Sequence, residues 1–92
     1  LSGHIEIARL RLAKVFLAEA NYDSALSLAI ESSSDSFSSL FAELRGDVFY
    51  AQGKLMDARA AYQSSIENLI EGEPRRVLLA MKIDDMAIAD GS

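Results

Sequence analysis

The sequence has no cysteine, a single histidine and a single proline, and no long apolar run. Without cysteine the chain forms neither disulfides nor a thiolate nucleophile, and its redox compartment stays open. Because His4 stands alone, a metal site or a Ser–His nucleophile has almost no support. No stretch approaches the roughly 20 apolar residues of a membrane-spanning helix, and no signal-peptide pattern is present. We therefore expect no enzymatic activity, no cofactor and no metal.

Positive charge is also scarce, since 9 lysines and arginines stand against 14 acidic residues for a formal net charge of −5. Nucleic acid and anionic membrane surfaces would repel such a chain, so we expect neither as a partner. A composition that is 50% hydrophobic and 25% charged is typical of a folded protein. The length of 92 residues suits one domain, residues 1–92. Because the chain begins at Leu1, we expect it to be a piece of a longer protein.

Apolar residues recur at helical spacing along the whole chain, which predicts an all-α fold of about five helices. We expect these helices at about 4–19, 22–31, 36–52, 55–71 and 74–89. Asn21 and Gly53 suit left-handed turns between paired helices, and Gly72 ends the fourth helix. Pro74 suits the first position of the fifth helix, where its missing N–H loses no hydrogen bond. The serine-rich run 32–36 is expected to be a polar linker.

Each predicted helix buries one apolar stripe. The stripes are Ile5, Ala8, Leu12, Val15 and Phe16; Ala25, Leu26 and Ala29; Phe37, Leu40, Phe41, Leu44 and Val48; Ala58, Ala61, Tyr62, Ile66 and Leu69; Leu79, Ala80, Ile83, Met86 and Ala87. The first helix has a second apolar row, Ile7, Leu10 and Leu17, and the last helix has Val77, Leu78, Met81 and Ile88. These extra residues either pack against neighbouring helices or form a docking surface. The candidates for that apolar docking surface are Ile7, Val77, Leu78 and Ile88.

An internal repeat appears when the chain is shifted by 33 residues. Residues 13–20 then lie over residues 46–53, and Ala25 lies over Ala58. A helix–turn–helix unit with a period of about 34 residues is the signature of a tetratricopeptide repeat (TPR). We predict one repeat at about 4–31, a second at about 36–71, and a C-terminal helix at about 74–89. The alternative is a generic helical bundle in which this spacing is a coincidence.

The repeat has a physical basis in side-chain size. Two helices approach closely only where a side chain is small, and an aromatic ring one turn later fills the wedge between them. A permissive residue then forms the turn, and Tyr62 fills the gap to the next repeat. The residues assigned to repeat packing are Ala13, Phe16, Ala25, Gly46, Phe49, Gly53, Ala58 and Tyr62. An antiparallel helix-pair solenoid is the predicted architecture.

Four segments resemble a known family. They are Glu-Leu-Arg-Gly-Asp at 43–47, Ala-Gln-Gly-Lys at 51–54, Ala-Arg-Ala-Ala-Tyr at 58–62, and Leu-Ala-Met-Lys-Ile-Asp-Asp-Met at 79–86. Together they resemble the C-terminal TPR-like region of the YfgM family, the ancillary subunits of the bacterial SecYEG translocon. The resemblance implies a parent with one N-terminal membrane anchor and a domain on the periplasmic side of the inner membrane. It also implies association with the translocon and with a periplasmic chaperone, PpiD, and it carries no catalytic motif.

In TPR stacks the first helix of each pair lines a groove that binds partners. By position, the predicted groove residues are Leu10, Lys14, Leu17, Glu43, Asp47, Tyr50, Met81 and Asp85. Glu43 and Asp47 lie one turn apart, so they form an acidic patch or pair with Arg45 or Lys14. An apolar or basic partner suits this groove, and we expect acidic C-terminal peptides not to bind.

Two adjacent arginines at the start of the last predicted helix are expected to need acidic partners. Arg75 and Arg76 open the last helix, where the helix dipole disfavours cations. Glu71 or Glu73 is the expected partner, and a carboxylate of a binding protein is the alternative.

The sequence alone leaves three functions open. The first is a binding module, the periplasmic part of a scaffold that links the translocon to chaperones. The second is a self-associating domain that forms a homodimer through its first or last helix. The third is a cytoplasmic TPR co-chaperone or assembly factor.

Overall fold

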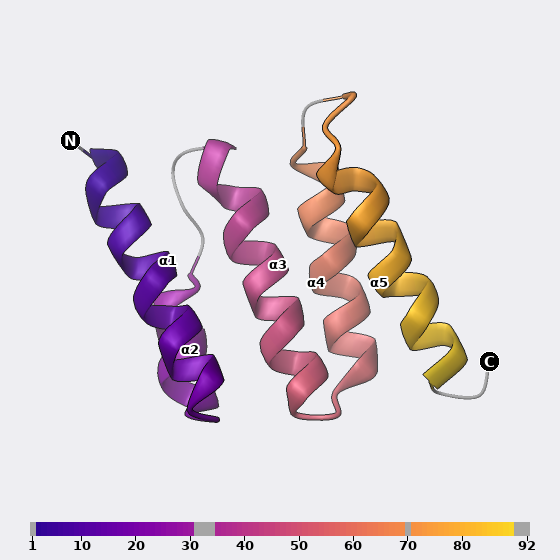
Figure 1. The fold of residues 1–92 in the computed structure, drawn as a ribbon, viewed down its shortest axis with the longest axis horizontal. Coiled ribbons are helices and arrows are strands. Elements are labelled where there is room, and N and C mark those ends of the chain that lie inside the picture. The colour runs from indigo at the N-terminus through magenta and orange to yellow at the C-terminus, as the bar shows by residue number, and fades with distance from the viewer. Residues whose placement is uncertain (1, 31–34, 70, 90–92) are drawn as a thin grey trace.

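The computed structural model describes residues 2–30, 35–69 and 71–89, and the side chains of residues 2, 35, 36 and 87–89 lie outside the description. Its helices are α1 (Ser2–Ala18), α2 (Tyr22–Leu28), α3 (Asp35–Ala51), α4 (Leu55–Glu67) and α5 (Arg75–Ala89). Successive helices run antiparallel, and α1 and α5 lie at opposite ends of the row (Figure 1). The molecule is a slab of 44 × 33 × 16 Å. The all-α helix-pair architecture is confirmed, whereas most of the linker expected at 32–36 lies outside the described residues.

The turn between α1 and α2 repeats the turn between α3 and α4. The Asn21 N–H donates to the Phe16 carbonyl at 2.8 Å, and the Lys54 N–H donates to the Phe49 carbonyl at 2.9 Å. This six-to-one bond marks a Schellman motif in both places. The two turns are related by the same 33-residue shift that aligns the sequence, so the repeat extends to backbone geometry.

The left-handed residues of these turns are Ala20, with φ of 60°, and Gly53, with φ of 78°. Asn21, the residue predicted to be left-handed, has φ of −91° and caps the start of α2. That prediction is wrong by one position, because the six-to-one bond fixes which residue reverses the chain. Ala20 therefore adopts a conformation that disfavours any side chain with a Cβ.

Replacing Ala20 with glycine is expected to raise the free energy of unfolding by about 0.5–1 kcal/mol, because glycine adopts positive φ without strain. Chemical denaturation checks the value. The reciprocal change, Gly53→Ala, is the control and should destabilise by about 1 kcal/mol. An unchanged or lowered stability for Ala20→Gly would contradict the left-handed turn.

Two clusters of buried side chains hold the helices together. The first contains Ala13, Ala29, Phe41 and Leu44, with Leu10, Leu17, Leu28 and Phe37 packed against it. The second contains Ala58, Tyr62, Leu79 and Met86, with Phe49, Leu55, Ile66, Leu69 and Ile83 packed against it. In the stripe predicted for α5, Ala80 is exposed, and the side chain of Ala87 lies outside the described residues. Because the second cluster contains residues of both α4 and α5, apolar packing joins these two helices.

The stripe predicted for α1 is wrong except for Phe16, which is partly buried. Ile5, Leu12 and Val15 are 65%, 46% and 50% exposed, and Ala8 is exposed as well. Two residues of the second row face the core instead, since Leu10 and Leu17 pack against the first cluster beside the fully buried Ala13, whereas Ile7 of that row is exposed. Apolar residues surround this helix, so spacing alone does not fix its rotation. The rotation of α1 is fixed by the small side chain of Ala13, which is fully buried where α1 packs against the neighbouring helices.

Two arginines anchor the C-terminal end of α2. Arg9 donates to the Leu28 carbonyl at 3.0 Å, and Arg45 donates to the Ala29 carbonyl at 2.8 Å. These carbonyls lack helical partners, and the helix dipole favours cations beside them. The Arg9 guanidinium also lies 4.9 Å from the centre of the Phe41 ring. Arg9 thereby joins α1, α2 and α3 and helps to set the rotation of α1.

Two helices end earlier than predicted. α2 ends at Leu28 instead of residue 31, at the two carbonyls that the arginines occupy. α4 ends at Glu67 instead of residue 71, and the Asn68 side chain donates to the Ser64 carbonyl at 2.8 Å. Side-chain donors thus bind the carbonyls at both of these helix ends.

Candidate functional site

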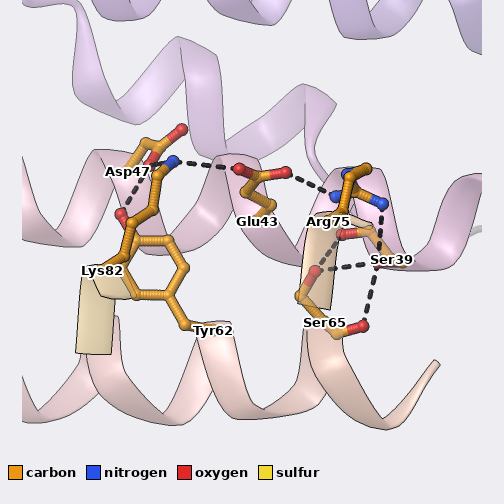
Figure 2. Close-up of polar contacts among 7 residues, drawn as sticks. All are labelled: Ser39, Glu43, Asp47, Tyr62, Ser65, Arg75 and Lys82. Atoms are coloured by element: carbon orange, nitrogen blue, oxygen red, sulfur yellow. Dashed lines mark hydrogen bonds and ion pairs between the residues drawn. The ribbon is translucent and has the colours of Figure 1, made fainter. Parts of the chain in front are cut away.

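One face of α3 carries a row of polar side chains. Ser39, Glu43 and Asp47 are spaced by four residues, which places them one above another along the helix. Figure 2 shows these side chains meeting Tyr62 and Ser65 of α4 and two cations of α5. The row therefore lies where α3, α4 and α5 converge.

Glu43 and Asp47 are paired with cations of α5. Arg75 Nη2 lies 2.5 Å from Glu43 Oε1, and Lys82 Nζ lies 2.9 Å from Glu43 Oε2 and 3.0 Å from Asp47 Oδ1 (Figure 2). The expected partners were Arg45 or Lys14 for the carboxylates, and Glu71 or Glu73 for Arg75. Those expectations are wrong because α5 packs beside α4 and brings its inner cations over α3. The acidic patch is therefore largely neutralised.

The pairing shifts the ionisation of both partners. Burial alone would raise the pKa of Glu43, but hydrogen bonds from Arg75 and Lys82 outweigh burial and hold that pKa below its usual value. Burial alone would lower the pKa of Lys82, but its bonds to Glu43 and Asp47 outweigh burial and raise it. Both groups are therefore held in their charged forms.

Tyr62 connects this network to the packing of the repeat. Its ring lies against Gly46, where an added Cβ would come within 2.4 Å of a ring carbon. Its hydroxyl donates to Asp47 at 2.5 Å, and the Lys82 ammonium lies 5.4 Å from its ring centre. Burial raises the pKa of the Tyr62 hydroxyl, and the bond to Asp47 raises it further. Gly46 thus makes room for a neutral tyrosine that orients the Asp47 carboxylate.

A reciprocal serine pair joins α3 to α4 beside these ions. The Ser39 hydroxyl donates to the Ser65 carbonyl at 2.9 Å, and the Ser65 hydroxyl donates to the Ser39 carbonyl at 2.7 Å. Arg75 donates to the Ser39 hydroxyl at 3.1 Å, which links the pair to α5 (Figure 2). Both serines are buried, so the close approach of the two helices depends on small side chains.

Most of the predicted groove residues border two hollows. A hollow of about 80 Å³ between α1 and α3 is lined by Leu10, Lys14, Leu40, Glu43, Leu44 and Asp47. A hollow of about 200 Å³, here the α3–α5 hollow, is lined by Asp47, Tyr50, Tyr62, Lys82 and Asp85. Asp47 borders both hollows, so together they make one polar, partly aromatic surface across α1, α3, α4 and α5.

Two predicted groove residues lie elsewhere. Leu17 packs against the first core cluster, and Met81 is 55% exposed without lining either hollow. Met81 lies one position before Lys82, which turns it by about 100° away from the network. Neither residue therefore lines the two hollows that the other six predicted groove residues border.

The predicted apolar docking surface is not one surface. Val77 and Leu78 of α5 are 64% and 59% exposed. Ile7 of α1 is 38% exposed and lines a hollow of about 360 Å³ with His4, Ala8 and Arg11, at the opposite end of the row (Figure 1). The side chain of Ile88 lies outside the described residues. Each end of the slab therefore has its own exposed apolar side chains.

The described ranges contain neither a metal-binding cluster nor a membrane span. No group of three or more histidine and acidic side chains within them is placed to hold a metal ion. None of the helices described is long and apolar enough to cross a bilayer.

Comparison with known proteins agrees with this geometry. A family described as tetratricopeptide repeat-like domain matches residues 2–88. The chain is also 34% identical over 80 residues to the ancillary SecYEG translocon subunit of Neisseria gonorrhoeae. That match covers 87% of this chain and 38% of the relative, so the chain spans well under half of the relative's length. No solved structure matches significantly. The chain belongs to the tetratricopeptide repeat-like domain family, and its likeness to this relative confirms the resemblance to the YfgM family.

Proposed function

We propose that this domain is a non-catalytic scaffold on the periplasmic side of the bacterial inner membrane, where it links the Sec translocon to a periplasmic chaperone. The observation that carries the proposal is the similarity to an ancillary translocon subunit across 87% of the chain. Repeat-like domains of this kind present extended surfaces to other proteins rather than enclosed catalytic pockets. The two open hollows beside α3 suit such a surface.

The position of Tyr50 favours the α3–α5 hollow as the contact with a partner. Tyr50 is 48% exposed, more than the partly buried Phe49 beside it and the buried Tyr62 that lines the same hollow. Exposed tyrosines beside charged groups are typical of protein interfaces. Tyr50 is therefore the side chain whose loss should weaken a complex without weakening the fold.

Affinity capture from gently solubilised cell envelopes tests the proposal. A tagged form of the protein should recover translocon subunits and a periplasmic chaperone, and Tyr50→Ala should reduce both. Gln63→Ala, at an exposed position of α4, is the matched control and should leave recovery unchanged. Recovery of neither class of partner would overturn the proposed function.

A homodimer is the second candidate. The observation that favours it is the exposure of Ile5, Leu12 and Val15 on α1 and of Val77 and Leu78 on α5. Sedimentation velocity over a wide concentration range tests this candidate. A monomer at every concentration would remove it, whereas a dimer abolished by Leu12→Ser or by Val77→Ser would identify the face that pairs.

A further inference from the structure

The α3–α5 hollow has the size and the exposed charge of a receptor for one side chain. Its volume is about 200 Å³, whereas a single water molecule needs roughly 10–15 Å³. Three helices contribute to it, with Tyr50 from α3, Tyr62 from α4 and Asp85 from α5. Because rigid helices hold all three, the hollow is formed before any partner arrives.

The charges around the hollow do not balance. Lys82 gives its ammonium to Glu43 and Asp47, and Arg75 binds Glu43, so two cations neutralise two carboxylates. Asp85 also lines the hollow, is exposed, and forms no ion pair with any described residue. One carboxylate therefore remains unmatched at the edge of the hollow.

The aromatic lining suits a cation as well. Tyr50 is 48% exposed, so a face or edge of its ring is open to a partner. The Tyr62 ring already has a cation within the range of cation–π attraction, the Lys82 ammonium 5.4 Å from its centre, so Tyr50 is the ring that remains for a partner's cation. A guanidinium stacks on an aromatic ring while its N–H groups bind a carboxylate in a bidentate way.

Building on the proposed function, we propose that the α3–α5 hollow binds an arginine side chain of a partner protein, stacked on Tyr50 and paired with Asp85. A carboxylate in this position would meet the unmatched charge of Asp85, whose repulsion disfavours acidic segments. An apolar side chain would leave the Asp85 charge without a partner. A basic segment is thus the occupant that the charges fit.

Titration of the isotope-labelled protein with a short peptide, followed by NMR, tests the assignment. The probe is acetyl-Gly-Ala-Arg-Ala-Gly-amide at low ionic strength. Two matched probes replace arginine with citrulline, its neutral isostere, or with glutamate. Saturable shifts of the Tyr50 and Asp85 amides are expected with the arginine peptide. The citrulline peptide should bind about tenfold more weakly, and the glutamate peptide should not bind.

Neighbouring aspartates provide the control variant. Asp85→Asn should weaken the arginine peptide about tenfold. Asp84→Asn removes the same charge from the adjacent exposed position, which points roughly 100° away, and should leave affinity unchanged. Equal binding of the arginine and citrulline peptides, equal effects of the two variants, or no shifts at Tyr50 and Asp85 would overturn the proposal.

The same variants separate this proposal from the proposed function. If the Asp85→Asn variant still captures translocon and chaperone at full yield, the scaffold role is supported and the arginine site is contradicted. If the arginine peptide binds as expected but capture recovers neither partner, arginine binding by the hollow is supported and the proposed partners are contradicted.

Discussion

Replacing Gly46 with alanine is expected to lower the free energy of unfolding by about 2–3 kcal/mol. In most helix interiors the same change stabilises a protein by about 0.5–1 kcal/mol, because alanine is the better helix former. Here the new Cβ would come within 2.4 Å of a Tyr62 ring carbon. The ring has little room to move, since it is 3% exposed and its hydroxyl is bonded to Asp47. Urea denaturation followed by circular dichroism measures the loss.

Removing the ring should reverse the sign of this effect. In a Tyr62→Ala background the added Cβ has no ring to meet, so Gly46→Ala should stabilise by about 0.5–1 kcal/mol. The double-mutant cycle then yields a coupling energy of about 3 kcal/mol between the two positions. A destabilisation of similar size in both backgrounds would show that Tyr62 is not the obstacle.

Replacing Glu43 with glutamine is expected to cost about 2 kcal/mol at neutral pH. The variant keeps the shape of the side chain but loses the charge that binds Arg75 and Lys82. The Glu43 side chain is only 23% exposed, so solvent screens these bonds less than it screens a surface pair. Glu71→Gln, in an exposed turn, is the control and should change stability by less than about 0.5 kcal/mol.

The effect of Glu43→Gln should depend on pH in a defined direction. The pKa of Glu43 is lowered in the folded state, so its contribution is complete above the unfolded value of 4.5. The contribution is lost as the pH falls through the lowered folded pKa. Wild type and variant should therefore converge in stability as the solution is acidified below pH 4.5. A difference that stays constant with acidification would exclude the ion pairs as its source.

The free energy of unfolding is also expected to fall at alkaline pH. The pKa of Lys82 is raised in the folded state, so its contribution is complete below 10.5 and is lost as the pH rises through the folded pKa. Tyr62 acts in the same direction, since its hydroxyl ionises more readily once the chain unfolds.

The second helix pair could be predicted well from the sequence because its signals are local. The small Gly46 and Ala58, the aromatic Tyr62 and the turn at Gly53 lie within 17 residues, and repeat geometry relates them. The structure buries Gly46, Ala58 and Tyr62 and gives Gly53 a positive φ. The spacing of nearby residues is sufficient to predict the buried face of a helix that has only one apolar face.

The rotation of α1 could not be predicted in that way. Two apolar rows compete on this helix, and each has the spacing of a buried stripe. The choice depends on Ala13 and on Arg9, which reaches the end of α2 and the Phe41 ring. These contacts join segments 19 to 32 residues apart, which a pattern along one helix does not report.

The ion network at the site was missed for a related reason. Its bonds join residues 32 to 39 positions apart, from α3 to α5. Glu71 and Glu73 are nearer to Arg75 in sequence, but α5 packs so that Arg75 and Lys82, seven residues apart on one face, lie over α3. One sequence signal could have indicated the serine contact. Ser39 lies seven residues before Gly46, so these two small residues share the face of α3 that approaches α4.

Site-specific photocrosslinking inside cells shows whether partners contact the surface between α3 and α5. A photoreactive residue would replace Tyr50 in the hollow, Met81 on the outer face of α5, or Gln63 on α4. We expect adducts with translocon or chaperone subunits from position 50 and few or none from position 63. Adducts of the protein with itself at position 81 would point to the dimer. Partner adducts from positions 63 or 81 without any from position 50 would place the partner contact outside the α3–α5 hollow.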